Sequence, residues 1–207
     1  PLNASMSQLE KTLRELTQGT MKRARAKLAE HATRWTRPSV DRTGTEERFE
    51  PTTTRFVRLV SEGQDAALKN TSTFTIDEFE IWSTGPTPKN VALASTGAKA
   101  SGKAREIADF PGAYGPHLAI DGKVGRRFLA RGGSLTIELK QPTRIDRVLF
   151  SSARRESVPA HKKFIFVAEY RIEISDDGKT WKSVANSHSR KPANEAHRDH
   201  RLNRLEM

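Results

Sequence analysis

The sequence predicts a mainly β protein, a jelly-roll β-sandwich preceded by an N-terminal helical arm. Short segments in which apolar and polar residues alternate recur from residue 55 onward, and turn-forming residues separate them. No helical periodicity lies between these segments, whereas residues 7–34 place apolar side chains at helical spacing. The 207 residues, of which 35% are hydrophobic, allow one medium domain with an extension.

The N-terminal segment, residues 7–34, is predicted to form a helix. Ser7 and Glu10 fit a capping box, in which each side chain accepts a hydrogen bond from a free backbone N–H group at the helix start. Two apolar stripes follow, Leu9, Leu13 and Leu16 and then Met21, Ala24 and Leu28. We expect Gly19 to break or bend the helix, because glycine costs about 1 kcal/mol relative to alanine there. Stripes this short favour a helix that lies on its own domain; the alternative is a coiled-coil partner helix.

A polar segment follows the helix and predicts a linker. Residues 36–54 contain Pro38 and Pro51 and show no apolar alternation. We therefore assign residues 1–50 to a helical arm and linker, residues 51–192 to the sandwich and residues 193–207 to a charged tail.

The predicted strands share an alternation of apolar and polar residues. They are RFVRLV (55–60), IDEFEIW (76–82), SLTIELK (134–140), RIDRVLF (144–150) and YRIEIS (170–175). Asp177 and Gly178 supply the chemistry of a tight hairpin turn, and Trp181 and Val184 anchor the return strand.

The chain shows no motif typical of an enzyme. GAKASGKA (97–104) resembles a phosphate-binding loop, but Ala104 stands where a hydroxyl would hold Mg²⁺, so we expect a flexible loop. His188, His197 and His200 lie near the C-terminus, where we expect a solvated tail rather than a metal site. Cysteine is absent, which excludes disulfides and thiolate metal sites.

The charge balance favours a polyanionic partner. Thirty-six Lys and Arg residues against 25 Asp and Glu residues give a net charge of +11. The basic residues are spread from Arg14 to Arg204 rather than gathered among stacking aromatic residues, so we do not expect a nucleic-acid reader. No apolar run approaches the ~18 residues of a membrane span.

Several of these segments together resemble the discoidin family. AIDGKVGRRF (119–128), taken with DRVLF, YRIEISDDGKTW and RFVRLV…IDEFEIW, is similar to coagulation factor V/VIII type C, galactose-binding-like jelly rolls over roughly residues 55–190. The resemblance extends to modules of large bacterial envelope proteins that also carry cytochrome c-type haem domains. It implies a periplasmic or extracellular location in the cell envelope. The start at proline suggests a stretch of a longer protein, and no C-x-x-C-H haem attachment lies in this segment.

The order of the segments differs from the family layout. There the RFVRL…EFEIW hairpin closes the domain, whereas here residues 55–82 come first. We expect one circularly permuted sandwich with this hairpin moved to the front, since chain termini often lie close together. The alternative is the tail of one discoidin copy followed by a second, incomplete copy.

The resemblance also implies a structural Ca²⁺ ion. It assigns side-chain ligands to Asp121 and Glu78, and backbone carbonyl ligands to Leu118, Lys123 and Asp77. Hard cations take about 6–8 such oxygens. Arg126 and Phe128 depart from the family, which often has threonine and tryptophan there, and a guanidinium at position 126 opposes a cation. The alternative is that Asp121 only caps a turn.

Ligand contacts are expected on loops at one end of the sandwich, as the resemblance implies. The candidates are Tyr114, His117, Arg126, Arg127, Arg154, Arg155 and His161. Arginine forks suit carboxylates, sulfates and phosphates. We therefore expect a non-catalytic module of a larger bacterial protein that binds carbohydrate, with acidic polysaccharide favoured by the net charge. The alternative is a structural or docking domain that packs against sister domains or proteins of the parent.

Overall fold

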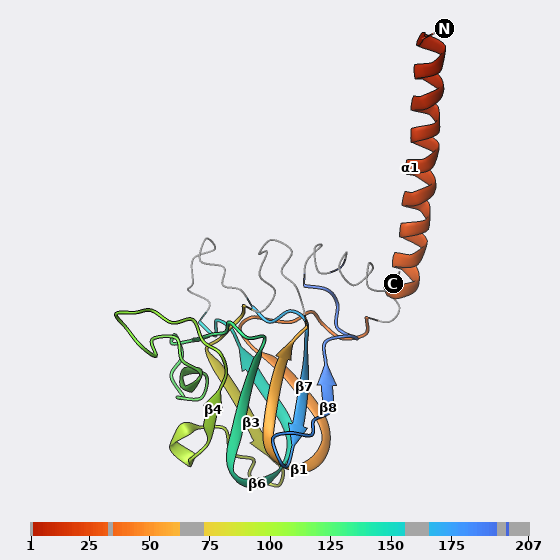
Figure 1. The fold of residues 1–207 in the computed structure, drawn as a ribbon. Helices are drawn as coiled ribbons and strands as arrows, with labels where there is room; N and C mark the ends of the chain where they lie inside the picture. Colours follow the sequence, from red (N-terminus) through yellow and green to blue (C-terminus); the bar gives the residue numbers. More distant parts are fainter. Residues whose placement is uncertain (1, 33–34, 63–72, 156–165, 194–197, 199–207) are drawn as a thin grey trace.

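The protein is mainly β, with antiparallel strands and an N-terminal α-helix (Figure 1). The computed structural model describes residues 2–32, 35–62, 73–155, 166–193 and 198. The fold class predicted from the sequence, a β-sandwich with an N-terminal helix, is confirmed.

Helix α1 (Leu2–Ala32) is longer and more regular than predicted. It begins before Ser7, so Ser7 lies inside the helix and the predicted capping box is wrong. It also continues through Gly19 without a break. The flanking residues are mostly strong helix formers, which offset the cost of one glycine. Within the described residues, no helix is long and apolar enough to cross a membrane.

The apolar stripe of α1 is exposed, and the helix projects away from the strands (Figure 1). Its large apolar side chains are half or more exposed, namely Met6 60%, Leu9 70%, Leu13 67%, Leu16 61% and Met21 51%. The expectation that these side chains lie on the chain's own domain is therefore wrong. The side chains of Ala24 and Leu28 lie outside the described part of the chain.

Within the described residues, eight strands and two short 3-10 helices follow α1. The strands are β1 (Thr45–Ser61), β2 (Thr75–Ile76), β3 (Glu78–Ser83), β4 (Lys99–Ser101), β5 (Phe128–Leu129), β6 (Ser134–Ser151), β7 (Tyr170–Ser175) and β8 (Lys182–Asn186). The 3-10 helices are η1 (Ala94–Thr96) and η2 (Pro116–Ala119). One sheet has the order β3-β6-β1-β7-β8, with β4 also paired to β6, and β2 pairs with β5 in a second, small sheet.

The two longest strands, β1 and β6, bend and thereby fold the large sheet into two facing layers. Residues 45–48 pair with 147–150, and residues 56–60 pair with 134–138, with register shifts between the two stretches. Phe150, from the second half of β6, meets Tyr170 of β7 edge to face at 4.9 Å between ring centroids. Phe79 of β3 stacks on the other side of the same cluster, 6.4 Å from Phe150. These rings join the layers through one core.

Strands β1 and β3 do not form the predicted hairpin, because β6 lies between them. Both pair antiparallel with β6, β1 along one edge and β3 along the other. Strand β6 thus pairs with one edge of each front strand. The front segments and the strands after residue 133 consequently form one sheet.

The core is built largely from the residues that the alternation predicted. Leu59, Phe79, Ile81, Ile137, Leu139, Val148 and Ile172 are all at most 1% exposed. Two predictions differ. Phe56 is only half-buried, and Trp181 lies on the outer face of the sheet, where the Arg58 guanidinium stacks 3.9 Å from its ring centroid. Trp181 directly precedes β8, and a cation covers its ring instead of the core.

The predicted hairpin between β7 and β8 is confirmed. Asp177 accepts backbone N–H bonds from Lys179 and Thr180 at 2.8 Å each, and these bonds hold the pKa of its carboxyl below the usual range. Gly178 has a φ of 71°, a conformation that side chains with a Cβ atom rarely adopt.

Strand β1 begins at Thr45, inside the segment that was predicted as a linker. Its first residues are polar, which hides the strand from a hydrophobicity pattern. Thr45 and Glu47 are nevertheless 2% exposed, so the inward positions of this stretch carry polar side chains. A buried carboxylate needs hydrogen-bonded partners of opposite charge, and the tertiary structure supplies them.

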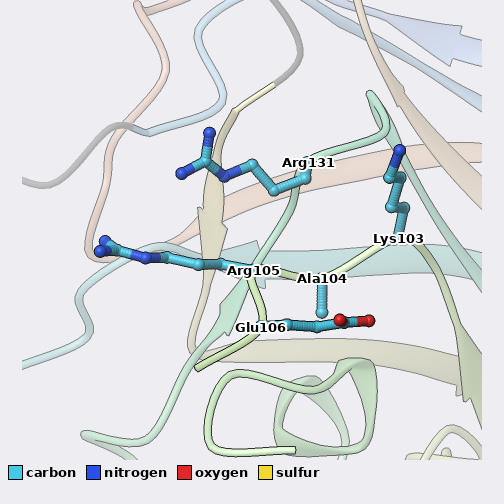
Figure 2. A pocket seen from close by; sticks show the side chains of 5 residues that line it. All are labelled: Lys103, Ala104, Arg105, Glu106 and Arg131. Carbon is cyan, nitrogen blue, oxygen red and sulfur yellow. The ribbon is translucent and has the colours of Figure 1, made fainter. Parts of the chain in front are cut away.

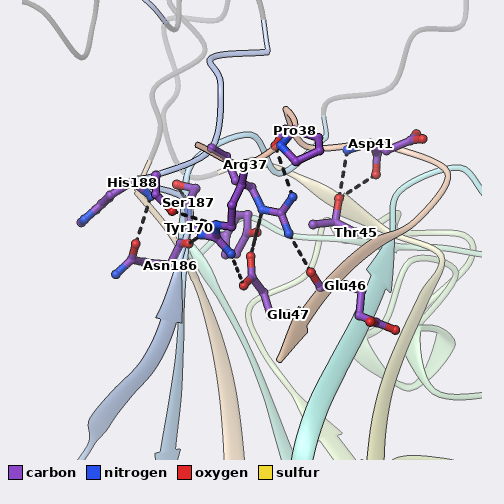
Figure 3. A network of polar contacts seen from close by, with 12 residues as sticks. Arg37, Pro38, Asp41, Thr45, Glu46, Glu47, Tyr170, Asn186, Ser187 and His188 are labelled. Carbon is purple, nitrogen blue, oxygen red and sulfur yellow. Dashed lines mark hydrogen bonds and ion pairs between the residues drawn. The ribbon is translucent and has the colours of Figure 1, made fainter. Parts of the chain in front are cut away.

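Glu47 is the centre of a buried polar network (Figure 3). It accepts hydrogen bonds from Arg37 Nη1 at 2.6 Å, from Arg190 Nε at 2.9 Å and from the Tyr170 hydroxyl. Burial and the Glu47 carboxylate raise the pKa of Tyr170 above its usual range. Arg37 also donates its backbone N–H to the Ser189 carbonyl at 3.0 Å. The segment that follows α1 is thereby fastened to the segment that follows β8.

Candidate functional site

The long connections of the sandwich gather at one end, which we call the loop end. There β1 ends at Ser61, which pairs with Tyr170 at the start of β7, and β6 begins at Ser134, which pairs with Val60. Residues 102–133 run over this end between β4 and β6. The opposite end holds tight turns, including the hairpin at Gly178.

Two carboxylates meet at the loop end, Glu78 at the start of β3 and Asp121 in the turn after η2. Glu78 is 3% exposed, and the Asp121 side chain is 17% exposed. One oxygen of each, Glu78 Oε1 and Asp121 Oδ2, is buried without a hydrogen-bond partner among the described residues. The other Asp121 oxygen, Oδ1, accepts the backbone N–H of Lys123 at 2.8 Å, as the turn-capping alternative predicted.

The pKa of Glu78 is shifted because its carboxylate is buried near that of Asp121. Burial and the Asp121 carboxylate raise the pKa of Glu78 to about 7, while the Arg154 guanidinium opposes the shift. Asp77 is differently placed, since its two oxygens accept hydrogen bonds from the Ser151 hydroxyl and from the Arg154 backbone N–H. Both of its side-chain oxygens are therefore engaged, and the predicted ligand role concerns its backbone carbonyl.

The carboxylate pair fits a hard cation in part. Two unpartnered buried carboxylate oxygens are the donor type that Ca²⁺ prefers. Within the described residues, however, no group of three or more His, Cys, Asp or Glu side chains could hold a metal ion. Further ligands would have to be carbonyls, such as the predicted ones of Leu118 in η2, Lys123 and Asp77. Arg126 Nη1 also lies 3.7 Å from Asp121 Oδ2, so a guanidinium already approaches one of the two oxygens.

The loop end also holds a basic depression whose lining residues are not among the ligand contacts expected from the sequence, although Lys103 and Ala104 belong to the GAKASGKA segment (Figure 2). It has a volume of about 480 Å³ and is lined by Lys103, Ala104, Arg105, Glu106 and Arg131. Its three cationic side chains are exposed. The alternation of Lys103, Ala104 and Arg105 was the available signal, because it places both cations on one face of an extended segment.

The predicted ligand residues fall into separate groups. Arg126 and Arg154 come together around the carboxylate pair, where Arg154 Nη1 donates to Glu80 at 2.6 Å. Tyr114 is half-exposed, and its carbonyl accepts the Leu129 N–H at 3.2 Å, close to the backbone of the depression. The rest of the predicted set consists of exposed His117 and Arg155, half-buried Arg127, and His161, which lies outside the described residues. None of the described members of the set lines the depression.

The segment that resembled a phosphate-binding loop has a different structure. Gly97 closes η1, residues 99–101 form β4, and Ala104 pairs with Ala130. This is a strand followed by an extended segment, without the helix N-terminus that a phosphate-binding loop needs.

The fold and its loop end define a β-sandwich binding module. Residues 98–206, just over half of the chain, match the F5/8 type C domain family. The chain therefore belongs to the F5/8 type C domain family, as its resemblance to discoidin modules predicted. The matched residues leave out β1 and β3, although both strands belong to the same sheet. No curated protein and no solved structure matches the chain.

Domains of this family are generally non-catalytic modules that bind carbohydrates, phospholipids or proteins, and they are typically extracellular. The chain accordingly belongs to a family of binding modules.

Proposed function

We propose that this chain is a carbohydrate-binding module that prefers acidic polysaccharides and binds them at the loop end. The observation that carries the proposal is the connection of residues 102–133. It holds six basic residues against three acidic ones, and the strands β4, β5 and β6 support it. A ligand site on loops that a rigid sandwich positions is the usual arrangement for a binding domain.

A polysaccharide panel tests this proposal. We expect isothermal titration calorimetry to show binding to polygalacturonate and dextran sulfate, and at most weak binding to neutral dextran. Binding should weaken as salt rises, because exposed charges are screened within about 10 Å at 0.1 M ionic strength. Absence of binding to every acidic and neutral polysaccharide would remove the proposal.

The docking alternative keeps one supporting observation, the exposed apolar stripe of α1. Unpartnered side chains such as Leu9, Leu13 and Leu16 are typical of a helix that pairs with another apolar surface. Sedimentation velocity of the wild type and of a Leu9→Ser/Leu13→Ser variant would test it. Concentration-dependent association of the wild type that the variant lacks would support docking. If the wild type and the variant are both monomeric at every concentration, this would count against self-association.

We also propose that Glu78 and Asp121 share a structural Ca²⁺ ion, which would relieve the repulsion between their two unpartnered oxygens. EDTA should then lower the melting temperature of the wild type, and Asp121→Asn should abolish this response. Asp109→Asn, on an exposed acid of the same connection, is the control and should keep it. A wild-type melt that EDTA and added Ca²⁺ leave unchanged would mean that the pair stands without a cation.

A further inference from the structure

We propose that Lys103, Arg105 and Arg131 form a subsite for a compact anionic group, the carboxylate or sulfate of an acidic sugar. The inference rests on the proposed polysaccharide binding and names its charged contact. None of the residues selected from the sequence as ligand contacts takes part in it.

The backbone holds the two segments that carry these three side chains next to each other. Ala104 and Ala130 form an antiparallel bridge, in which Arg131 N–H donates to the Lys103 carbonyl at 2.7 Å and Arg105 N–H donates to the Leu129 carbonyl at 2.8 Å. Ala130 is fully buried, so its side of the bridge faces the core. Alternation along both segments then places residues 103, 105 and 131 on the outer side.

The two segments approach each other closely at Gly132. A Cβ atom at this position would lie 2.8 Å from Lys103 Cβ, which is shorter than real contacts allow. Glycine therefore lets the stem of Lys103 pack against the turn that carries Arg131. The spacing between the backbone segments that carry these two cations therefore depends on this packing.

The charges of the depression suit an anion. Within the described residues, neither Lys103 nor Arg105 makes an ion pair, so both charges are available to a ligand. Figure 2 shows Arg105 and Arg131 reaching toward one side of the depression, whereas Lys103 rises from the other side, above the Glu106 carboxylate. Arginine binds carboxylate and sulfate oxygens through paired N–H donors, and lysine adds a point charge. The volume of about 480 Å³ lies within the range of about 300–1,000 Å³ for small-ligand sites.

The test compares two variants of equal net charge. The first variant, Lys103→Ala/Arg105→Ala/Arg131→Ala, removes the three cationic side chains of the depression. The control, Lys89→Ala/Lys179→Ala/Lys182→Ala, removes three exposed cations from the opposite end of the sandwich. We expect the first variant to lose about tenfold or more in affinity for polygalacturonate or dextran sulfate, and the control to lose less than about twofold. Equal losses would overturn the subsite while leaving polysaccharide binding in place.

Gly132→Ala separates geometry from charge. It keeps every cation but displaces Lys103, so affinity should fall although the net charge is unchanged. Thermal melts monitored by circular dichroism establish that each variant is folded. If the triple variant does not fold, the milder Lys103→Gln/Arg105→Gln variant replaces it with the same expectation.

Titration with inorganic sulfate tests the subsite without a polysaccharide. We expect saturable amide chemical-shift changes at residues 103, 105 and 131 that the triple variant lacks. If the wild type binds no polysaccharide but shows these shifts, the proposed function fails and the anion subsite stands. Absence of the shifts in the wild type, or equal shifts across both ends of the sandwich, would overturn the subsite.

Discussion

Large apolar residues are mostly buried in the sandwich but exposed on helix α1. In the sandwich, Phe79, Leu135 and Tyr170 are fully buried, whereas Leu9 and Leu13 of α1 are 70% and 67% exposed. The sandwich is therefore held by contacts between residues far apart in the sequence. The helix is held by its own backbone hydrogen bonds, which are marginal for an isolated helix in water. The difference predicts that the sandwich folds without the arm, whereas the apolar stripe of α1 contributes little to its stability.

The largest expected effect comes from removing one region or the other. Deleting residues 1–34 should leave a cooperative melt, because the network of Arg37 and all strands remain. Deleting residues 1–85 should abolish folding, because β6 would lose β1 and β3 from its two edges. Circular dichroism melts of the two truncations check this. A cooperatively melting fragment of residues 86–207 would revive the two-domain interpretation.

Truncating one apolar side chain should lower the free energy of unfolding strongly in the sandwich and hardly at all in α1. Phe150→Ala removes a ring that contacts both Phe79 and Tyr170, and should lower the free energy of unfolding by about 3–5 kcal/mol. Leu13→Ala in α1 should change it by no more than about 0.5 kcal/mol. Urea unfolding followed by tryptophan fluorescence measures both. Similar losses from the two variants would mean that α1 packs on the sandwich in solution.

Two neighbouring glutamates on β1 should differ in the stability that is lost when each is replaced, because one is buried and the other is exposed. Glu47 is buried and pairs with Arg37 and Arg190, so Glu47→Gln should cost about 3 kcal/mol because it leaves buried cations without their counter-charge. Glu46 makes exposed ion pairs, and Glu46→Gln should cost less than about 1 kcal/mol. Urea unfolding again gives the comparison. Equal costs would mean that the network of Figure 3 contributes no more than a surface ion pair.

The smallest expected effect is a dependence on pH that belongs to the sandwich alone. The pKa of Glu78 is about 7 in the folded protein against 4.5 for its ordinary value, so the folded state binds more protons between these values. Without added cation, stability should therefore fall by about 2 kcal/mol as pH rises from about 5 to about 7. Melts of the wild type and of Glu78→Gln measure it, since the variant lacks this titration. A rise in stability attributable to Glu78 over the same window would contradict the assignment.

Added Ca²⁺ sharpens this last prediction. If the ion binds the Glu78 carboxylate, it should stabilise the wild type above about pH 7 and have little effect near pH 5, where protonation already relieves the repulsion. Asp121→Asn should remove the difference between the two conditions. The helicity of α1 should not respond in either case.

The sequence by itself determined the class of fold and most of the core. Alternation at Leu59, Ile137 and Ile172 identified strands with one buried face, and this signal is local, since it needs only the spacing of side chains along one segment. The hairpin around Asp177 and Gly178 could be predicted for the same reason, because turn chemistry is a property of consecutive residues. The resemblance of these segments to discoidin modules identified the family that the family comparison then showed.

Only the tertiary structure decided which segments meet. The sequence suggested that β1 and β3 form a hairpin, but β6 lies between them, and pairing between distant strands is not encoded in either strand alone. Polarity hid the start of β1, because Glu47 is buried only through partners at residues 37, 170 and 190. The depression of Lys103, Arg105 and Arg131 was hidden likewise, since a bridge between two separate segments assembles it. Charged sites and buried polar clusters form only when residues from elsewhere in the chain come together, so one segment does not reveal them. Alternation of apolar residues within one segment is enough to indicate which face of a strand is buried.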